Sequence, residues 1–375
     1  MHMLHRLCLL VLCLGIVGAT HAKTINTEAV NLRVETLKSG FSHPWGITEL
    51  PDGDLLITER NGNLKRLTPN GLVVSILGTP KNVFQEGQGG LLDIALAPDF
   101  ATNQRLYLSY AAVDEQGQAG TEVMVATLSK DVLIDSRVIF KALPKRGGGR
   151  HFGSRLLVTP EYLYITLGDR GHRDRAQFAD DHLGTLVRLH HDGTVPESNP
   201  FVQTPSKQSE VFSFGHRNIQ GIALDNNGTR IWAHEHGPQG GDELNVILAG
   251  ENYGWPTITH GVNYGLGTQI GEGTSKPGMR QPVYYWEPSI APSGMTMVNS
   301  QQFPMWQGDL LLGSLKFGLL VRLELENGQV RHEERMLEGQ FGRIRDVIQA
   351  RDGSLLILTD RRNGSVLRVT PLPQS

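Results

Sequence analysis

The sequence contains little cysteine and has no long hydrophobic run beyond its N-terminus. Both of its cysteines, Cys8 and Cys13, lie within the apolar run 7–17. A basic start before this run and a small-residue cleavage site ending at Ala22 are typical of a secretory signal peptide, which we place at residues 1–22. Cleavage there leaves a mature chain without thiols, so disulfide bonds and thiol chemistry are excluded.

The same shortage of apolar runs argues against insertion in a membrane. The run 7–17 is shorter than the roughly 20 residues that a spanning helix needs, and no later segment is apolar enough to span a bilayer. A retained N-terminal anchor is the alternative to cleavage. We expect a periplasmic or secreted protein with no stable membrane insertion.

The sequence also has no large excess of positive or negative charge and no cluster of residues typical of a zinc site. The chain has 35 Lys and Arg against 38 Asp and Glu, a net charge of -3. This balance gives no general attraction to nucleic acid or to anionic membranes, and a small anionic ligand fits any local cationic cluster better. No His and Cys residues stand at zinc-binding spacing.

In place of long amphipathic helical patterns, the sequence repeats a β-hairpin signature. An apolar stretch at 45–50 meets the turn Pro51-Asp52-Gly53-Asp54 and continues as a second apolar stretch at 55–59. Six such units occur, at intervals of irregular length. The five later ones begin near Leu91, Phe152, Ile219, Pro292 and Arg343.

A single hairpin exposes strand edges and cannot bury both of its faces alone. Radial stacking of six four-stranded antiparallel blades solves both problems, so the repeat favours an all-β, six-bladed β-propeller. We expect one such domain over residues 23–375, with a β-sandwich array as the alternative. The Gly-rich segment 261–279 has little apolar periodicity and is predicted to be an exposed loop beside the channel mouth.

Two arginines stand two residues apart in GRIRD. Arg343 and Arg345 on a strand project to the same face, and two guanidinium groups side by side repel unless an anion lies between them. Carboxylate matches the fork of donors on each arginine. The motif therefore indicates an anion site, with a solvated edge strand as the alternative.

His151 in GGGRHFGSR and Asp169 in LGDRG flank one predicted hairpin. Because a hairpin brings its ends together, Asp169 could orient the imidazole of His151 and raise its basicity, as a general base requires. A structural role for this histidine is the alternative.

The segment EHGPQGGDELN offers hard oxygen ligands. Backbone carbonyls at Gly237 and Pro238 are followed by carboxylates at Asp242 and Glu243, and calcium is bound by such mixed sets. An acidic turn without metal is the alternative.

Taken together, these motifs resemble the soluble PQQ-dependent glucose and aldose sugar dehydrogenase family. The resemblance runs through most of the mature chain. It rests on HPWGI, EGQGGLLDIA, RHFGSR, GDRG, FGHRNIQG, EHGPQGGDELN, ENYGWP, SIAPSGM, GRIRD and LTDRRNG. It implies a six-bladed propeller that holds pyrroloquinoline quinone (PQQ) and calcium at the channel mouth.

The resemblance also implies roles for individual residues. His151 is implied to be the general base, Asp169 its acidic partner, and Arg217 a cation over the reactive quinone carbonyl. The residues implied to hold PQQ together with Arg217 are Gln88, Asn218, Lys316, Arg343, Arg345 and Thr359. The calcium ligands implied are the carbonyls of Gly237 and Pro238 for the cofactor's ion, and Glu243 with the carbonyl of Tyr253 for a second ion.

The implied reaction oxidises an aldose at its anomeric carbon to a lactone, with electrons leaving to an external acceptor. The loops are shorter than in the glucose enzymes of the family, and His236 stands where those enzymes have another polar residue. Both differences favour a broad aldose preference and a monomer or weak dimer. Two other functions remain open. One is a calcium-dependent lactonase-type hydrolase, and the other is a non-catalytic propeller that binds a carbohydrate or a protein.

Overall fold

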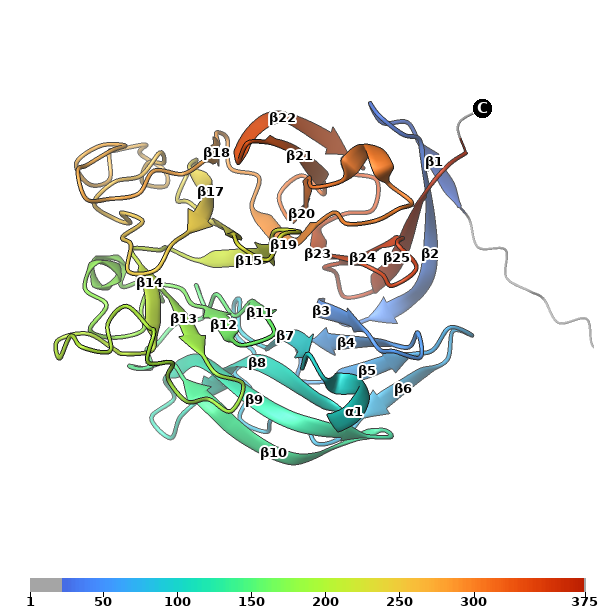
Figure 1. Ribbon diagram of the computed structural model, residues 1–375, viewed down its shortest axis with the longest axis horizontal. Coiled ribbons are helices and arrows are strands. Elements are labelled where there is room, and N and C mark those ends of the chain that lie inside the picture. The colour runs from blue at the N-terminus through green and yellow to red at the C-terminus, as the bar shows by residue number, and fades with distance from the viewer. Residues whose placement is uncertain (1–21, 374–375) are drawn as a thin grey trace, which may run out of the picture.

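The structure is a computed structural model that describes residues 22–373. Its strands form six blades around a central channel, which confirms the predicted all-β propeller (Figure 1). The predicted signal peptide lies outside the described residues except for Ala22. Within residues 22–373, no helix is long and apolar enough to cross a membrane.

The first three blades follow one another along the chain. Blade 1 contains β3 (Pro44–Glu49), β4 (Leu55–Glu59), β5 (Leu64–Leu67) and β6 (Val73–Ile76). Blade 2 contains β7 (Leu91–Leu96), β8 (Arg105–Val113), β9 (Ala119–Ser129) and β10 (Val132–Lys141), with the helix α1 (Phe100–Asn103) between its first two strands. Blade 3 contains β11 (Leu156–Val158), β12 (Leu163–Thr166), β13 (Thr185–Leu189) and β14 (Val211–Phe214), with the 3₁₀ turn η1 (Arg173–Gln177) before β13.

The other three blades complete the ring. Blade 4 contains β15 (Ile219–Leu224), β16 (Ile231–Glu235), β17 (Asp242–Ile247) and β18 (Tyr284–Trp286). Blade 5 contains β19 (Pro292–Met297), β20 (Leu310–Ser314), β21 (Leu320–Glu326) and β22 (Gln329–Met336), with the 3₁₀ turn η2 (Pro304–Trp306) before β20. Blade 6 contains β23 (Ile344–Gln349), β24 (Leu355–Thr359), β25 (Gly364–Pro371), β2 (Leu32–Phe41) and β1 (Lys23–Ile25).

The two ends of the chain meet in blade 6 and close the ring. Strand β2 pairs antiparallel with β25, from Leu32 opposite Pro371 to Phe41 opposite Gly364. Blade 6 also differs from the four-stranded prediction, because β1 pairs with the free edge of β2 and adds a fifth strand. This pairing joins the N-terminal strand to the C-terminal strands within one blade and so closes the ring.

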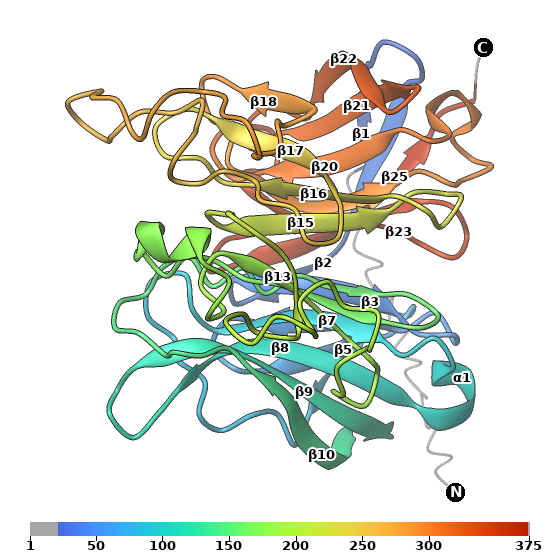
Figure 2. The same ribbon diagram turned by 60° about the vertical axis from the view of Figure 1, so that its left-hand side comes forward.

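The predicted hairpins are the two innermost strands of each blade. In blade 1, for example, Ile47 lies opposite Ile57, and the turn between them closes with a hydrogen bond from the amide of Leu50 to the carbonyl of Asp54. The turn residue Gly53 has a φ of 88°, a conformation that glycine adopts without strain. The predicted loop 261–279 contains no strand and projects from the molecule (Figure 2).

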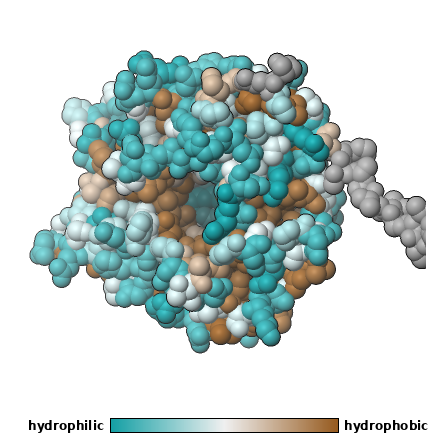
Figure 3. Space-filling view, turned by 45° about the vertical axis from the view of Figure 1, so that its right-hand side comes forward, coloured by the Kyte–Doolittle hydropathy of each residue, from teal (hydrophilic) through white to brown (hydrophobic). Residues whose placement is uncertain are grey.

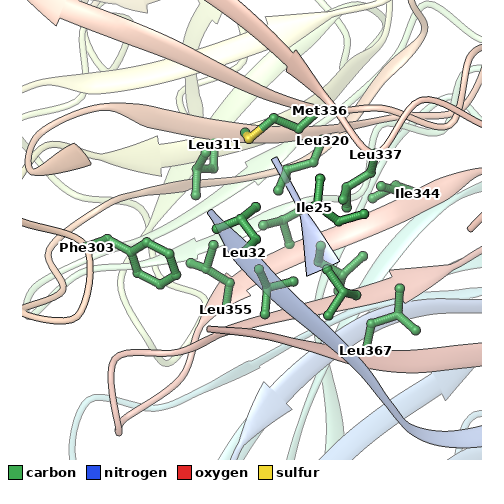
Figure 4. Packing of buried hydrophobic residues seen from close by; sticks show 14 of the residues in the cluster. Ile25, Leu32, Phe303, Leu311, Leu320, Met336, Leu337, Ile344, Leu355 and Leu367 are labelled. Carbon is green, nitrogen blue, oxygen red and sulfur yellow. The ribbon is translucent and has the colours of Figure 1, made fainter. Parts of the chain in front are cut away.

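The hydrophobic core is divided among the six junctions between neighbouring blades. One buried cluster fills each junction. Figure 4 shows the cluster between blades 5 and 6, where Ile25 and Leu32 pack with Leu320, Met336 and Leu355. Every blade therefore buries its faces against two neighbours.

The innermost strands all run in the same direction through the channel. Residues near their starts, such as Trp45 and Leu92, line a cavity at one mouth, and residues at their ends, such as Glu49 and Gln349, line a cavity at the other. Figure 3 shows one face of the molecule with a hollow near its middle, flanked by hydrophobic residues. The loops that precede the innermost strands and those that follow the second strands therefore gather polar residues at one mouth.

Candidate active site

One cavity opens at the start of the innermost strands. Its volume is about 880 Å³. Residues that are far apart in the sequence and were predicted to bind cofactor, metal or substrate line it together. These are Gln88, His151, Arg217, Gly237, Pro238, Lys316, Arg343 and Arg345. The remaining predicted residues lie behind its wall, namely Asp169, Asn218, Thr359, Glu243 and Tyr253.

His151 reaches the cavity from the glycine-rich loop before β11. Its φ of 55° is unusual for a residue with a side chain, and its backbone amide donates to Oε1 of Gln88 at 2.7 Å. A Cβ at Gly168 would lie 2.2 Å from the carbonyl oxygen of His151, so only glycine allows this approach. The backbone around the histidine is therefore fixed from two sides.

The imidazole of His151 is oriented by Asp169, as the sequence predicted it could be. Nδ1 of His151 lies 2.6 Å from Oδ1 of Asp169. The carboxylate also accepts hydrogen bonds from the amide of Gly171 at 2.7 Å and from Nε1 of Trp255 at 2.8 Å. Asp169 is thus a buried acceptor whose oxygens are all engaged.

The protonation states of this pair suit a general base. Burial raises the pKa of Asp169, but the hydrogen bonds from His151 and Gly171 outweigh it and hold the pKa below its usual value. Burial lowers the pKa of His151 and outweighs the opposing effect of Asp169. An ionised Asp169 requires the proton of a neutral His151 to be on Nδ1, which leaves the lone pair of Nε2 free.

Arg217 is held beside this pair. One Nη1 hydrogen bond of 2.9 Å goes to the carbonyl of His236, and the guanidinium lies 5.3 Å from the ring centroid of Trp255. Its backbone amide donates to Glu235 at 2.5 Å. Trp255 therefore contacts both Arg217 and, through its indole N–H, the carboxylate of Asp169.

The arginine pair has an internal anion that the sequence analysis did not identify. Arg345 donates to Oδ2 of Asp360 at 2.8 Å, and Arg343 lies 3.4 Å from the same oxygen. Burial raises the pKa of Asp360, but Arg345 holds it well below its usual value. The side chain of Arg343 is 52% exposed, whereas that of Arg345 is 8% exposed. Arg343 is therefore the more available of the two for a ligand.

Three other predicted cofactor residues differ in their access to the cavity. Lys316 is exposed and has no acidic partner among residues 22–373. Asn218 is buried and its Oδ1 accepts from the amide of Gly153 at 3.1 Å. Thr359 is also buried, and its hydroxyl accepts from the amide of Ser365 at 2.9 Å. Direct contact of Asn218 and Thr359 with a cofactor stays a prediction.

The predicted calcium carbonyls are available. Neither Gly237 nor Pro238 has a carbonyl oxygen that accepts a hydrogen bond from the described part of the chain. Asp242 shapes their turn instead of competing for a metal, because its oxygens accept from the amides of Gly237 and Ala291, both at 2.8 Å. Two free carbonyls at the wall of a cavity fit a calcium ion that takes its other ligands from a bound anion.

The second predicted calcium site lies just behind Arg217. The buried Glu235 lies opposite the half-buried Glu243 on the neighbouring strand. Removal from water, followed by repulsion from Glu235, raises the pKa of Glu243 well above its usual value. Oδ1 of Asn245 is buried there without a hydrogen-bond partner. Tyr253 also lines this small pocket. Two adjacent carboxylates, one of them buried, and an unpaired oxygen fit a cation.

Sequence reasoning missed several residues that the structure brings to this site. Trp255 and Asp360 stood inside quoted motifs without a role, and Trp45 and Arg60 line the cavity. An available signal was the need of each buried arginine for an anion, which points to the acidic residue of LTDRRNG. His236 also lines the cavity, and its Nε2 lies 2.7 Å from the carbonyl of Pro292.

Comparison with known proteins gives close matches over nearly the whole chain. The sequence model of the family described as Glucose / Sorbosone dehydrogenase matches residues 41–368. The aldose sugar dehydrogenase YliI of Escherichia coli (strain K12) is 42% identical over 346 residues, which cover 91% of this chain and 93% of that protein.

Solved structures of aldose sugar dehydrogenases also superpose on this chain. The soluble aldose sugar dehydrogenase of Escherichia coli in its apo-form superposes with a TM-score of 0.88 at 41% identity, covering 91% of this chain and 100% of the other. The PQQ-bound form of an aldose sugar dehydrogenase from Streptomyces coelicolor superposes with a TM-score of 0.75 at 28% identity, covering 94% and 100% of the two chains.

Proposed function

The chain belongs to the glucose/sorbosone dehydrogenase family of oxidoreductases, and from this premise we propose that it oxidises aldose sugars to lactones with PQQ and calcium. The observation that supports this most is the lining of the cavity. A neutral, oriented His151 shares it with Arg60, Arg217, Lys316, Arg343 and Arg345, in a protein whose net charge is negative.

The residues present fit the cofactor. PQQ is a flat quinone with three carboxylates, and cations around one cavity are the partners such a polyacid needs. Nε of Arg345 is buried without a hydrogen-bond partner among the described residues, which leaves a donor for an anion. Lys316 and the half-exposed Arg343 are the side chains we expect to bind its carboxylates. The carbonyls of Gly237 and Pro238 are the expected calcium ligands.

When bound, PQQ supplies a quinone carbonyl that accepts hydride. The chain's own part is proton transfer: Nε2 of His151 takes the proton of the anomeric hydroxyl while the hydrogen on that carbon leaves as hydride and the C=O bond of the lactone forms. Asp169 stabilises the imidazolium that results. Arg217 contributes a fixed positive charge where negative charge develops. Turnover then requires an external electron acceptor.

The hydrolase alternative is not favoured by the channel centre. A lactonase-type site needs carboxylates and amides converging on one calcium ion there. In the described chain the central carboxylates, Asp93 and Asp346, are instead paired with Arg155 at 3.2 and 3.0 Å. That position therefore already has its cation.

Reconstitution tests the proposal. Purified protein is loaded with PQQ and calcium, given a panel of aldoses and an artificial electron acceptor, and assayed for dye reduction and lactone formation. We expect turnover with several aldoses that needs both additions. Absence of turnover with all sugars, or hydrolysis of lactones without PQQ, contradicts the proposal.

We also propose export, with residues 1–22 removed and a single mature domain, 23–375, acting in the periplasm or outside the cell as a monomer or weak dimer. N-terminal sequencing of the protein from the exported fraction is expected to begin at Lys23. A mature protein that keeps the run 7–17 contradicts this proposal.

A further inference from the structure

A single buried arginine connects several blades at the middle of the channel. Arg155, which directly precedes β11 of blade 3, is 5% exposed. It donates from Nε to the carbonyl of Gln220 in blade 4 and from Nη2 to the carbonyl of Arg345 in blade 6, both at 2.9 Å. Its Nη1 lies 3.2 Å from Asp93 of blade 2 and 3.0 Å from Asp346 of blade 6. One side chain therefore ties four blades together.

The fifth contact of Arg155 is aromatic and reaches blade 1. Its guanidinium lies 4.0 Å from the ring centroid of Trp45, and the guanidinium of Arg345 lies 5.6 Å from the same ring. Stacking of this kind is attractive and fixes the ring. The two arginines and the tryptophan thus form one packed group.

This group separates the two cavities of the channel. Trp45, Gln220 and Arg345 line the large cavity in which we place the cofactor. Arg155 lines a second cavity of about 390 Å³ at the opposite mouth, together with Asp93, Asp346 and residues from the ends of inner strands. Arg155 therefore lies directly beneath the residues that form the floor of the cofactor cavity.

The carboxylates around Arg155 are themselves fixed. Asp93 accepts from the amide of Leu156 at 2.8 Å, and Asp346 accepts from the amide of Ile47 at 3.1 Å. A Cβ at Gly294 would lie 1.8 Å from Oδ1 of Asp346. The absence of a side chain at this glycine therefore leaves the space that the carboxylate occupies. The two carboxylates are therefore held by backbone amides as well as by Arg155.

We propose that Arg155 is a positioning residue for the cofactor, an inference that rests on the function proposed above. It holds the backbone carbonyls of Gln220 and Arg345 and the ring of Trp45, and so fixes the floor on which PQQ lies. The planar guanidinium has five donors in fixed directions, whereas a lysine ammonium has three donors at one point and cannot serve all these partners.

The test compares Arg155→Lys with a matched control, Arg322→Lys. Arg322 in blade 5 is also buried and is paired with Asp309 and Glu334, both at 2.8 Å, but none of these residues lines the cofactor cavity. Both variants are measured for Tm and for the Kd of PQQ, by titrating PQQ into calcium-loaded protein and following quenching of tryptophan fluorescence.

We expect both variants to lose thermal stability. Arg155→Lys should raise the Kd of PQQ at least about 10-fold, equivalent to about 1.4 kcal/mol, while Arg322→Lys leaves it within about twofold. Folded Arg155→Lys protein that binds PQQ like the wild type overturns the inference. Wild-type protein that binds no PQQ overturns the proposed function, and this inference with it.

A second variant serves if Arg155→Lys does not fold. Arg155→Met combined with Asp93→Asn and Asp346→Asn removes all three charges, so no buried charge is left unpaired. We expect this protein to fold and still to bind PQQ at least about 10-fold more weakly than wild type. Unchanged affinity in the folded triple variant contradicts a positioning role.

Discussion

Replacement of Asp169 by asparagine tests the proposed base pair directly. The carboxylate accepts a 2.6 Å hydrogen bond from His151 that strengthens when the imidazole takes up a proton. A hydrogen bond to a charged group contributes about 1.5–3 kcal/mol. Loss of that amount from the transition state lowers kcat about 10- to 150-fold. The loss is larger if the new amide donates to Nδ1, because the proton then stays on Nε2 and the base is absent.

The pH profile gives Asp169→Asn a signature of its own. The base form of His151 is the active one, so kcat/KM falls as the pH drops through the pKa of His151. Burial places this pKa below its usual value of 6.5, and Asp169 opposes that shift. Removal of the carboxylate therefore lowers the pKa further. We expect the acid limb of the profile to move to lower pH while its plateau falls.

The assay is steady-state dye reduction by protein saturated with PQQ and calcium, across a pH series. The Kd of PQQ should stay within about twofold of wild type, because Asp169 does not line the cavity. Asp309→Asn, a buried carboxylate paired with Arg322 in blade 5, is the control, and its kcat should match wild type. A wild-type kcat in Asp169→Asn, or an acid limb displaced to higher pH, refutes the assignment.

Three further predictions concern charge. Arg343→Ala should raise the Kd of PQQ about 10-fold with little change in Tm, whereas Arg345→Ala, which removes the close buried partner of Asp360, should lower both affinity and Tm. Burial lowers the pKa of His234 to about 3, so unfolding takes up a proton as the pH falls below about 6.5. Each pH unit then lowers the unfolding free energy by up to about 1.4 kcal/mol, and His234→Leu should flatten this loss in denaturant titrations at pH 4–7. Calcium should raise the Tm of wild type more than that of Glu243→Gln, and an equal increase in both contradicts a metal site there.

The hairpins could be predicted from sequence because their signals are local. Each hairpin joins two apolar stretches through a turn of a few residues, so both strands and their turn lie within one short segment of the sequence. Closure of blade 6 had no such signal, because the pairing of β2 with β25 joins residues more than 300 positions apart, such as Leu32 and Pro371. The extra strand β1 has only three residues, too few for an apolar pattern to be recognised, and its pairing depends on an edge that the folded blade provides.

Part of the site could be predicted for the same reason. His151 and Asp169 flank one hairpin, and the structure places them in contact. Trp255 could not be assigned a role, because it comes from the next blade and its indole reaches Asp169 only after the ring has assembled. Arg155 was overlooked likewise, since its polar partners belong to blades other than its own.

The arginine pair shows how sequence spacing can give the right chemistry with an incomplete partner. Two cations on one strand face do need an anion, and the protein supplies one in Asp360. One carboxylate cannot neutralise two guanidinium groups, and it lies closer to the buried Arg345 than to Arg343. Arg343 and Lys316, which both line the cavity, therefore retain positive charge that no described residue neutralises. That surplus, more than the pair itself, is what an anionic cofactor would recognise.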